Sequence, residues 1–224
     1  MKYRLLIFDL DGTLIDSKRD IANAVNHALE LENLPPLDNK LIYSFIGDGM
    51  FGLIEKTLST RKEYKQVNIE KLLKLYAEYY NDHLLDSTVL YPGVKEILEH
   101  YRKYKKAIVS NKEESFSRKI LEKLNVCRHF DIIFGSNSTK NRKPDPEPLI
   151  KVMDLLNVGP EETIMIGDGI NDIIAALKAN VKSCIVTHDP EVEKEFLAEN
   201  KPDFCINSLI QLKGITNPGR DYVS

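Results

Sequence analysis

A first apolar run of strand length lies at 3–9, and after residue 90 further runs of this kind alternate with helical patterns. The later runs occur at 106–110, 131–134, 163–167 and 183–186, with a shorter candidate at 203–206. Between them, apolar residues recur at helical spacing at 93–103, 113–125, 146–157, 170–179 and 189–198. Because strands that alternate with helices build parallel sheets covered on both faces, the pattern predicts an α/β fold with a parallel sheet.

The segment between the first run and residue 89 follows a different pattern. It contains no convincing strand, and its apolar residues recur at helical spacing. They form two groups, one at Ile21, Ala24, Val25, Ala28 and Leu29 and the other at Leu72, Leu73, Tyr76, Tyr79 and Tyr80. We therefore expect a core domain made of residues 1–15 and 89–214, a helical insertion at 16–88 directly after the first strand, and a C-terminal tail at 215–224.

The composition of the 224 residues, 42% apolar and 29% charged, is that of an ordinary globular protein. A net charge of −3 leaves no basic field for nucleic acid or an anionic membrane surface. The start of the chain, MKYRLLIFDLDG, has acidic residues too early for a signal peptide, and no apolar run approaches the roughly 20 residues of a membrane helix. We expect a cytoplasmic protein without a nucleic-acid or membrane partner.

Polar side chains gather where the predicted strands end. They are Asp9 and Asp11 after the first strand, Ser110 and Asn111 after the second, and Asp168, Asn171 and Asp172 after the strand at 163–167. A lysine, Lys143, lies in a loop just before a helix. Ligands of open parallel sheets bind outside the carboxyl ends of the strands, so these side chains are predicted to form one site.

The residue types of this site limit its chemistry. Clustered carboxylates repel one another unless a cation is present, and an all-oxygen set suits a hard ion such as Mg2+. The five histidines and three cysteines are scattered without the spacing of a zinc site. A lysine and a hydroxyl beside the cation suit a phosphate, and a carboxylate can act as nucleophile through an aspartyl-phosphate. The set therefore predicts phosphoryl transfer.

Four short motifs resemble those of the haloacid dehalogenase-like hydrolases. They are DLDGT at 9–13, VSNK at 109–112, KPDP at 143–146 and GDGIND at 167–172, in the order and approximate spacing of that family. The resemblance covers nearly the whole chain. It implies a Rossmann-like core with a helical cap inserted after the first strand, in agreement with the insertion at 16–88.

The resemblance also implies roles for the residues that match these motifs. Asp9 corresponds to the nucleophile and Asp11 to the general acid and base. Ser110 and Lys143 correspond to the residues that hold the phosphate, and Asn111 lies close by, either as a substrate contact or as support for its loop.

The metal ligands implied in the same way are the carboxylates of Asp9 and Asp168 and the main-chain carbonyl of Asp11. Asp172 corresponds to an outer or occasional ligand of Mg2+. Thr13 has two possible roles, since its hydroxyl can bind phosphate or satisfy the turn. Lys112 is expected to be a solvated residue ahead of a helix.

Features within the family favour a phosphatase that resembles the phosphoglycolate phosphatase group. The segment SFIGDGMFGLIEKTL at 44–58 is similar to a cap loop of that group, so Gly47, Asp48 and Gly49 are expected to face the core site and contact substrate. The alternative is a simple helix start capped by Asp48. Backbone amides near Gly49 are expected to bind the carboxylate of the substrate. Lys56 and Arg61 are the other candidates, but such residues are more often solvated charges on a helix face.

The predicted reaction is the Mg2+-dependent hydrolysis of a small phosphorylated metabolite, 2-phosphoglycolate in particular, by a monomer or homodimer. The alternatives on the same scaffold are a pyrophosphatase, a nucleotidase, a sugar phosphate phosphatase or a phosphomutase similar to β-phosphoglucomutase. A non-catalytic phosphate-binding protein is the alternative of a different class.

Overall fold

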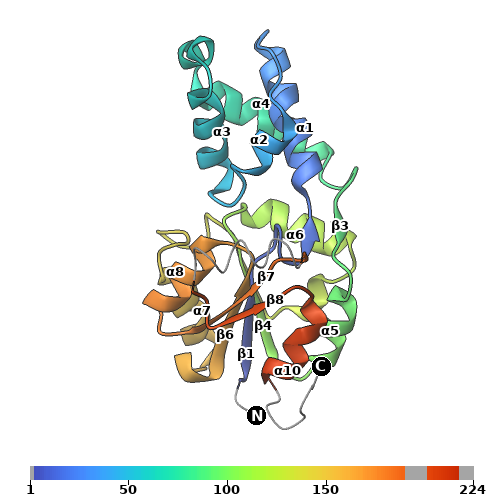
Figure 1. The fold of residues 1–224 in the computed structure, drawn as a ribbon, viewed down its shortest axis with the longest axis vertical. Coiled ribbons are helices and arrows are strands. Elements are labelled where there is room, and N and C mark those ends of the chain that lie inside the picture. The colour runs from blue at the N-terminus through green and yellow to red at the C-terminus, as the bar shows by residue number, and fades with distance from the viewer. Residues whose placement is uncertain (1–2, 190–200, 217–224) are drawn as a thin grey trace.

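The computed structural model describes residues 3–189 and 201–216, and its centre is a parallel sheet of six strands (Figure 1). In spatial order the strands are β5 (Ile132–Phe134), β4 (Lys105–Val109), β1 (Leu5–Phe8), β6 (Thr163–Gly167), β7 (Lys182–Val186) and β8 (Phe204–Ile206). Each neighbouring pair is parallel. The predicted α/β fold is thus confirmed, including the short strand near 203–206.

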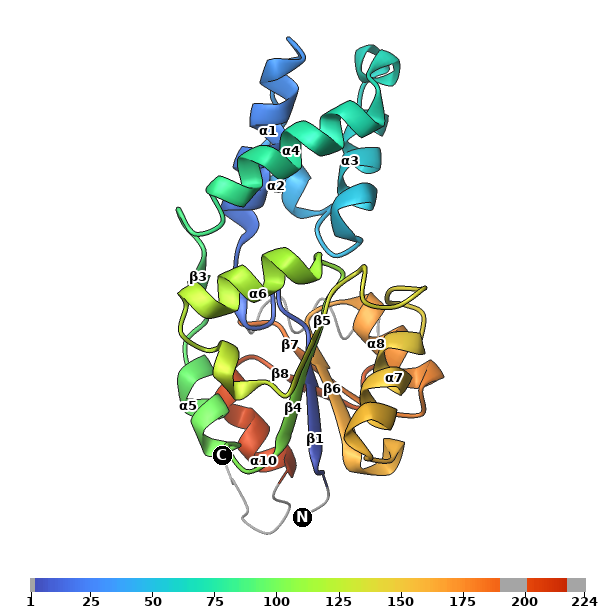
Figure 2. The ribbon, with the colours of Figure 1, turned by 180° about the vertical axis from the view of Figure 1, so that it is seen from behind.

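Helices cover both faces of this sheet (Figure 2). They are α5 (Val94–His100), α6 (Glu114–Lys123) and α10 (Leu212–Thr216) on one face and α7 (Glu147–Leu156) and α8 (Ile170–Lys178) on the other. Short 3-10 turns are η1 (Lys62–Gln66), η2 (Cys127–His129), η3 (Pro160–Glu162) and η4 (Leu209–Gln211). The helix predicted at 189–198 lies, apart from its first residue, outside the described residues.

The central strand β1 explains why its sequence is a continuous apolar run. Successive side chains of a strand point to opposite faces. Leu6 and Phe8 pack into the core cluster under α5 and α6, whereas Leu5 and Ile7 pack into the cluster under α7 and α8. All four side chains are fully buried. Both faces are covered, so no polar residue is tolerated until the strand ends at the site.

Four helices form a separate layer above the carboxyl ends of the strands (Figure 1). They are α1 (Lys18–Leu31), α2 (Asn39–Tyr43), α3 (Gly49–Ser59) and α4 (Ile69–Asp82). Two short strands connect this layer to the core, β2 (Ile15–Asp16) and β3 (Val89–Leu90), which pair antiparallel. Strands of two residues are too short to show a periodicity, so the sequence pattern did not indicate them.

We propose that residues 16–88 form a cap domain on a core of 1–15 and 89–214, since the paired linkers β2 and β3 flank the insertion. α10 extends to Thr216, two residues into the proposed tail, and 217–224 lie outside the described residues. Within the described part of the chain, no helix has the length and apolar character needed to cross a membrane.

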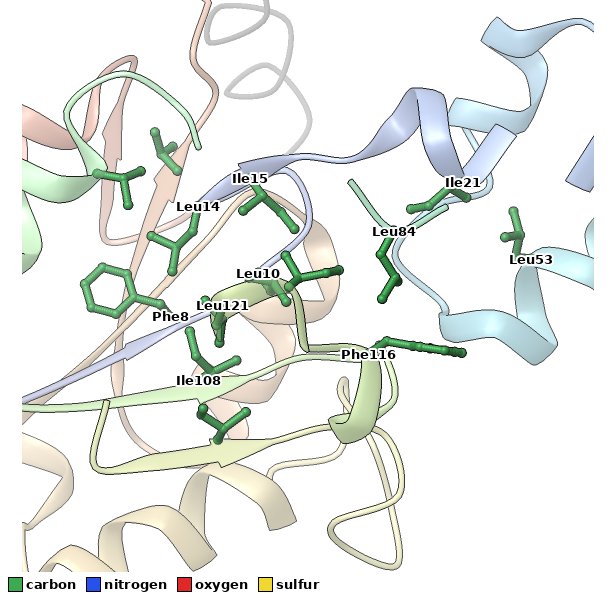
Figure 3. Packing of buried hydrophobic residues seen from close by; sticks show 14 of the residues in the cluster. Phe8, Leu10, Leu14, Ile15, Ile21, Leu53, Leu84, Ile108, Phe116 and Leu121 are labelled. Atoms are coloured by element: carbon green, nitrogen blue, oxygen red, sulfur yellow. The ribbon is translucent and has the colours of Figure 1, made fainter. Parts of the chain in front are cut away.

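The apolar cluster beside α6 continues from the sheet into the cap (Figure 3). Phe8 and Ile108 belong to the sheet, Phe116 to α6, and Ile21 and Leu53 to cap helices, and all are members of one cluster. The cap is therefore packed against the core in this structure.

A buried carboxylate ties the two cap linkers together. Asp20, 1% exposed, lies in the first turn of α1. Its Oδ2 accepts hydrogen bonds from the N–H of Ser87 at 3.0 Å and from the N–H and the hydroxyl of Thr88 at 2.8 and 2.7 Å. The start and the end of the insertion are thereby held side by side.

Candidate active site

The chain turns sharply after β1 and places the side chains of Asp9, Asp11 and Thr13 at one edge of the sheet. Asp9 follows the strand, and its N–H donates to the carbonyl of Ile166 at 2.8 Å. Gly12 has a φ of +83°, and a Cβ at this position would lie 2.1 Å from Oδ2 of Asp168. Only glycine fits this turn, because the left-handed conformation and the close approach to Asp168 both exclude a side chain.

Three carboxylates meet at the ends of β1 and β6. Oxygen atoms of Asp9, Asp168 and Asp172 all lie within 4.8 Å of one another. The hydroxyl of Thr13 donates to Oδ1 of Asp168 at 3.1 Å. In this structure Thr13 thus orients a carboxylate, a contact that the sequence did not indicate. Oδ2 of Asp172 accepts from the N–H groups of Asp168 and Gly169 at 3.2 and 3.1 Å.

The side chain of Lys143 bridges two of these carboxylates. Its Nζ lies 2.8 Å from Oδ1 of Asp9 and 2.6 Å from Oδ1 of Asp172, and its side chain is 2% exposed. Burial by itself would lower the pKa of Lys143, but the attraction of Asp172 and Asp9 outweighs it and raises the pKa. The lysine therefore remains a cation within the cluster.

Two of these carboxylates, Asp9 and Asp168, have raised pKa values. Burial raises the pKa of Asp9 to about 6, and Asp172 adds to this effect while Lys143 opposes it. Burial also raises the pKa of Asp168 well above its ordinary value, with further contributions from Asp9 and Asp172. One ammonium group does not neutralise three carboxylates that lie this close together. A set of oxygen donors in this state fits a hard divalent cation.

Ser110 and Asn111 follow β4 at the same edge and are both buried. Nδ2 of Asn111 donates to the main-chain carbonyls of Lys143 at 2.9 Å and of Gly47 at 2.8 Å. Asn111 thus supports two loops at once, one from the core and one from the cap. Both Ser110 and Asn111 line the cavity described below.

The cap loop at 47–49 lies directly on the core site. Gly49 has a φ of +72°, and a Cβ there would lie 2.7 Å from the carbonyl oxygen of Asn111. Nδ2 of Asn171 donates to the carbonyl of Gly47 at 3.3 Å and to Oδ1 of Asp48 at 2.9 Å. Asp48 also pairs with Lys56. The loop therefore reaches the core through Asn111, in the loop after β4, and Asn171, in the first turn of α8.

The structure contradicts the alternative in which Asp48 only caps the start of α3. The side chain of Asp48 makes no cap hydrogen bond to the helix, because it is engaged by Lys56 and Asn171 instead. Lys56 pairs with Asp48 and lines the cavity, and its side chain is still 44% exposed. Arg61 lies over the ring of Tyr64, 5.6 Å from its centroid.

The expectation for Lys112 is wrong. Its side chain is only 6% exposed, and its Nζ lies 2.9 Å from Oδ2 of Asp11. Oδ1 of Asp11 accepts from the hydroxyl of Ser17 at 2.5 Å. The motif VSNK contains Lys112, but a lysine ahead of a helix is usually solvated, and the cap that encloses it is distant in sequence. Ser17, the other partner of Asp11, was not expected at the site.

The site opens into a cavity of about 480 Å3 between core and cap. Its core lining includes Asp9, Asp11, Ser110, Lys143 and Asp168. Its cap lining includes Gly47, Asp48, Gly49, Tyr76 and Tyr80. A small molecule in this cavity would contact the carboxylate cluster at one end and the cap loop at the other.

Comparison with known proteins agrees with this arrangement. The family described as "Haloacid dehalogenase-like hydrolase" matches residues 6–186. A phosphoglycolate phosphatase of Chromobacterium violaceum is 32% identical over 220 residues, which cover 96% of this chain and 97% of the relative. A phosphoglycolate phosphatase of Psychrobacter arcticus is 37% identical over 188 residues, 81% of this chain and 82% of the relative.

Solved structures show the same architecture. A crystal structure of a protein from Haemophilus somnus, described as a predicted phosphoglycolate phosphatase, superposes with a TM-score of 0.85 at 27% identity. The match covers 96% of this chain and 99% of that protein. Together with the match over residues 6–186, this similarity means that the chain belongs to the haloacid dehalogenase-like hydrolases, as its four motifs predict.

Proposed function

We propose that this protein is a Mg2+-dependent phosphatase that hydrolyses 2-phosphoglycolate through an aspartyl-phosphate. The observation that carries the proposal is the convergence of Asp9, Asp168 and Asp172 with Lys143 at the floor of a cavity closed by a cap. The relatives named phosphoglycolate phosphatase over nearly the whole chain support this substrate.

The cation would be held by the carboxylates of Asp9 and Asp168 and the main-chain carbonyl of Asp11. Asp172 would support the site from outside, since its Oδ1 is engaged by Lys143 and its Oδ2 by two backbone N–H groups. A bound Mg2+ would neutralise charge between Asp9 and the phosphate of the substrate.

In the first half of the reaction, a carboxylate oxygen of Asp9 attacks phosphorus, and the bond from phosphorus to the substrate oxygen breaks. The carboxyl group of Asp11 donates its proton to that oxygen, which leaves as an alcohol. Ser110 and Lys143 hold the phosphate oxygens during the transfer.

In the second half, Asp11 is a carboxylate and takes a proton from water. The water oxygen bonds to phosphorus, and the bond between phosphorus and Asp9 breaks. Inorganic phosphate leaves, the carboxylate of Asp9 is restored, and Asp11 carries the proton needed for the next cycle.

The carboxylate of 2-phosphoglycolate would be bound by backbone N–H groups around Gly49 at the start of α3. Lys56 is a weaker candidate because Asp48 already compensates its charge. Localisation in the cytoplasm and a monomeric or homodimeric state remain predictions from the sequence.

The test is phosphate release from a panel with Mg2+ present, scored as kcat/KM. The panel contains 2-phosphoglycolate, pyrophosphate, nucleoside monophosphates and hexose phosphates. We expect 2-phosphoglycolate to be hydrolysed with the highest kcat/KM. A lead of more than about tenfold for another compound, about 1.4 kcal/mol in transition-state binding, would show that the substrate is wrong. An isomerised sugar phosphate would indicate a mutase, and no release from any compound would exclude a phosphatase.

A further inference from the structure

We propose that Lys112 is a positioning residue that holds the carboxyl group of Asp11 in place for proton transfer. The inference rests on the proposed phosphatase function, in which Asp11 protonates the leaving oxygen. It is drawn from three observations on Lys112: its ion pair with Asp11, its burial, and its contact with a cap helix.

The ion pair is nearly enclosed by protein. Nζ of Lys112 lies 2.9 Å from Oδ2 of Asp11, with the two side chains 6% and 12% exposed. A charge-assisted hydrogen bond is stronger and more directional where water is excluded. Because Ser17 donates to the other oxygen at 2.5 Å, both oxygens of Asp11 have a partner. Rotation of this carboxyl group would break both contacts.

The cap contributes to the same arrangement through an aromatic ring. Nζ of Lys112 lies 4.7 Å from the centroid of the Tyr80 ring, which belongs to α4. Tyr80 is itself buried and packs edge-on against Phe116 of α6, with ring centroids 5.4 Å apart. An aromatic face attracts a cation and excludes water from it. The position of Lys112, and through it that of Asp11, therefore depends on cap helix α4.

This placement has a specific kinetic consequence. A general acid acts only within hydrogen-bond reach of the leaving oxygen, and a displacement of about 1 Å can cost roughly 100-fold in rate. Loss of Lys112 should therefore impair reactions in which a poor leaving group needs a proton. It should have little effect when the leaving group departs as a stable anion, as p-nitrophenolate does.

The dependence of the rate on the leaving group also distinguishes the role of Lys112 from that of Lys143. Lys143 contacts Asp9 and Asp172, so its loss should impair every substrate to a similar extent. Lys112 contacts neither of them among the ion pairs of the described residues. The ratio of the kcat/KM values for the two substrates thus distinguishes a residue that positions the acid from one that holds phosphate or the nucleophile.

The experiment compares wild type and Lys112→Met with saturating Mg2+ on two substrates. One is p-nitrophenyl phosphate and the other is the alkyl phosphate with the highest kcat/KM in the panel, which we expect to be 2-phosphoglycolate. The parameter is kcat/KM, because it reports the half-reaction in which the leaving group departs. We expect a fall of about 30-fold or more for the alkyl phosphate and less than about 3-fold for p-nitrophenyl phosphate.

Two further variants and one control complete the design. Lys112→Arg keeps the charge and should restore part of the alkyl phosphate rate, and Tyr80→Leu should lower that rate in the same selective way but by less. The matched control is Lys119→Met, because Lys119 of α6 also contacts α4, through Oδ1 of Asn81, but lies on the surface. Both of its rates should stay at the wild-type level. Tyr80→Leu carries the test if Lys112→Met does not melt cooperatively.

An unchanged ratio of the two kcat/KM values, or an equal fall for both substrates, overturns the role of Lys112 and leaves the phosphatase intact. A wild-type protein that hydrolyses neither substrate overturns the proposed function, and this inference with it. A selective loss on the alkyl phosphate, partly restored by Lys112→Arg, supports the role.

Discussion

Replacement of the nucleophile by Asp9→Asn should stabilise the metal-free protein while it abolishes turnover. The side chain of Asp9 is 13% exposed and lies beside two other carboxylates. Asparagine keeps the volume and the oxygen that accepts from Lys143, but it carries no charge and provides no attacking carboxylate. The charge of Asp9 is needed for the reaction but lowers the stability of the folded protein, and this variant measures by how much.

The magnitude follows from the pKa of Asp9, which burial raises from 3.8 to about 6. A carboxyl group with a raised pKa in the folded state contributes stability that is present below its unfolded pKa and is lost as the pH rises through the folded value. Since each pH unit is worth about 1.4 kcal/mol, the loss is about 3 kcal/mol at pH 7.5 and about half of that at pH 5. Asp9→Asn avoids this loss, so its advantage should grow between pH 5 and 7.5.

The assay is urea denaturation in excess chelator at pH 5 and at pH 7.5. We expect the free energy of unfolding of Asp9→Asn to exceed that of wild type by up to about 3 kcal/mol at pH 7.5, and by roughly half as much at pH 5. Mg2+ at pH 7.5 should stabilise wild type more than the variant, because Asp9 is a proposed ligand. Asp154→Asn, on an exposed part of α7, is the control and should change neither value.

Two results would refute this reasoning. One is a variant that is no more stable than wild type in chelator at pH 7.5. The other is a gain that is the same at both pH values, because a charge effect of Asp9 must disappear as the carboxyl group becomes protonated.

Three further variants test the turn, the metal site and the cap linkers. Gly12→Ala should lower kcat by about 100-fold or more and the free energy of unfolding by about 1–3 kcal/mol, because its Cβ would lie 2.1 Å from Asp168 at a φ of +83°; wild-type kinetics would contradict the tight turn. Asp168→Ala should either eliminate phosphate release or raise the Mg2+ concentration needed for half-maximal release by about tenfold or more. Undiminished turnover of wild type in excess chelator would exclude the metal site. Asp20→Ala should lower the free energy of unfolding by about 2–4 kcal/mol, since it leaves three donors of Ser87 and Thr88 without their acceptor; a melting temperature equal to that of wild type would show that this carboxylate does not hold the linkers.

Much of the core site follows from local sequence. The run LLIF predicts a strand buried on both faces, and the residue after it must lie at the carboxyl edge of a parallel sheet. The same reasoning applies to Ser110 after β4 and Asp168 after β6. These side chains meet in the structure because neighbouring parallel strands end at a common edge. Their convergence can therefore be predicted without knowledge of the side-chain contacts.

The cap shows where such reasoning ends. Helical spacing predicted helices in 16–88, and a glycine-rich loop indicated where the cap meets the core. The partners of that loop were not predictable, since Asn111 and Asn171 are 64 and 124 residues away from Gly47. Asn111 lies in a loop and Asn171 in the first turn of α8, and nothing in the local sequence of either distinguishes it from an asparagine without a contact to a second domain.

The sequence by itself therefore determined the α/β sheet, the helical insertion and the set of strand-end residues, because strand and helix periodicity and the direction of a parallel strand are local properties of the chain. The tertiary structure alone decided that Lys112 is buried against Asp11 and Tyr80, that Thr13 orients Asp168, and that Asp20 joins the two linkers. Each of these contacts joins segments far apart in sequence. The environment of a polar side chain depends on what the rest of the chain places around it, and a lysine beside a loop becomes part of the site only once a cap helix excludes the water that would otherwise surround it.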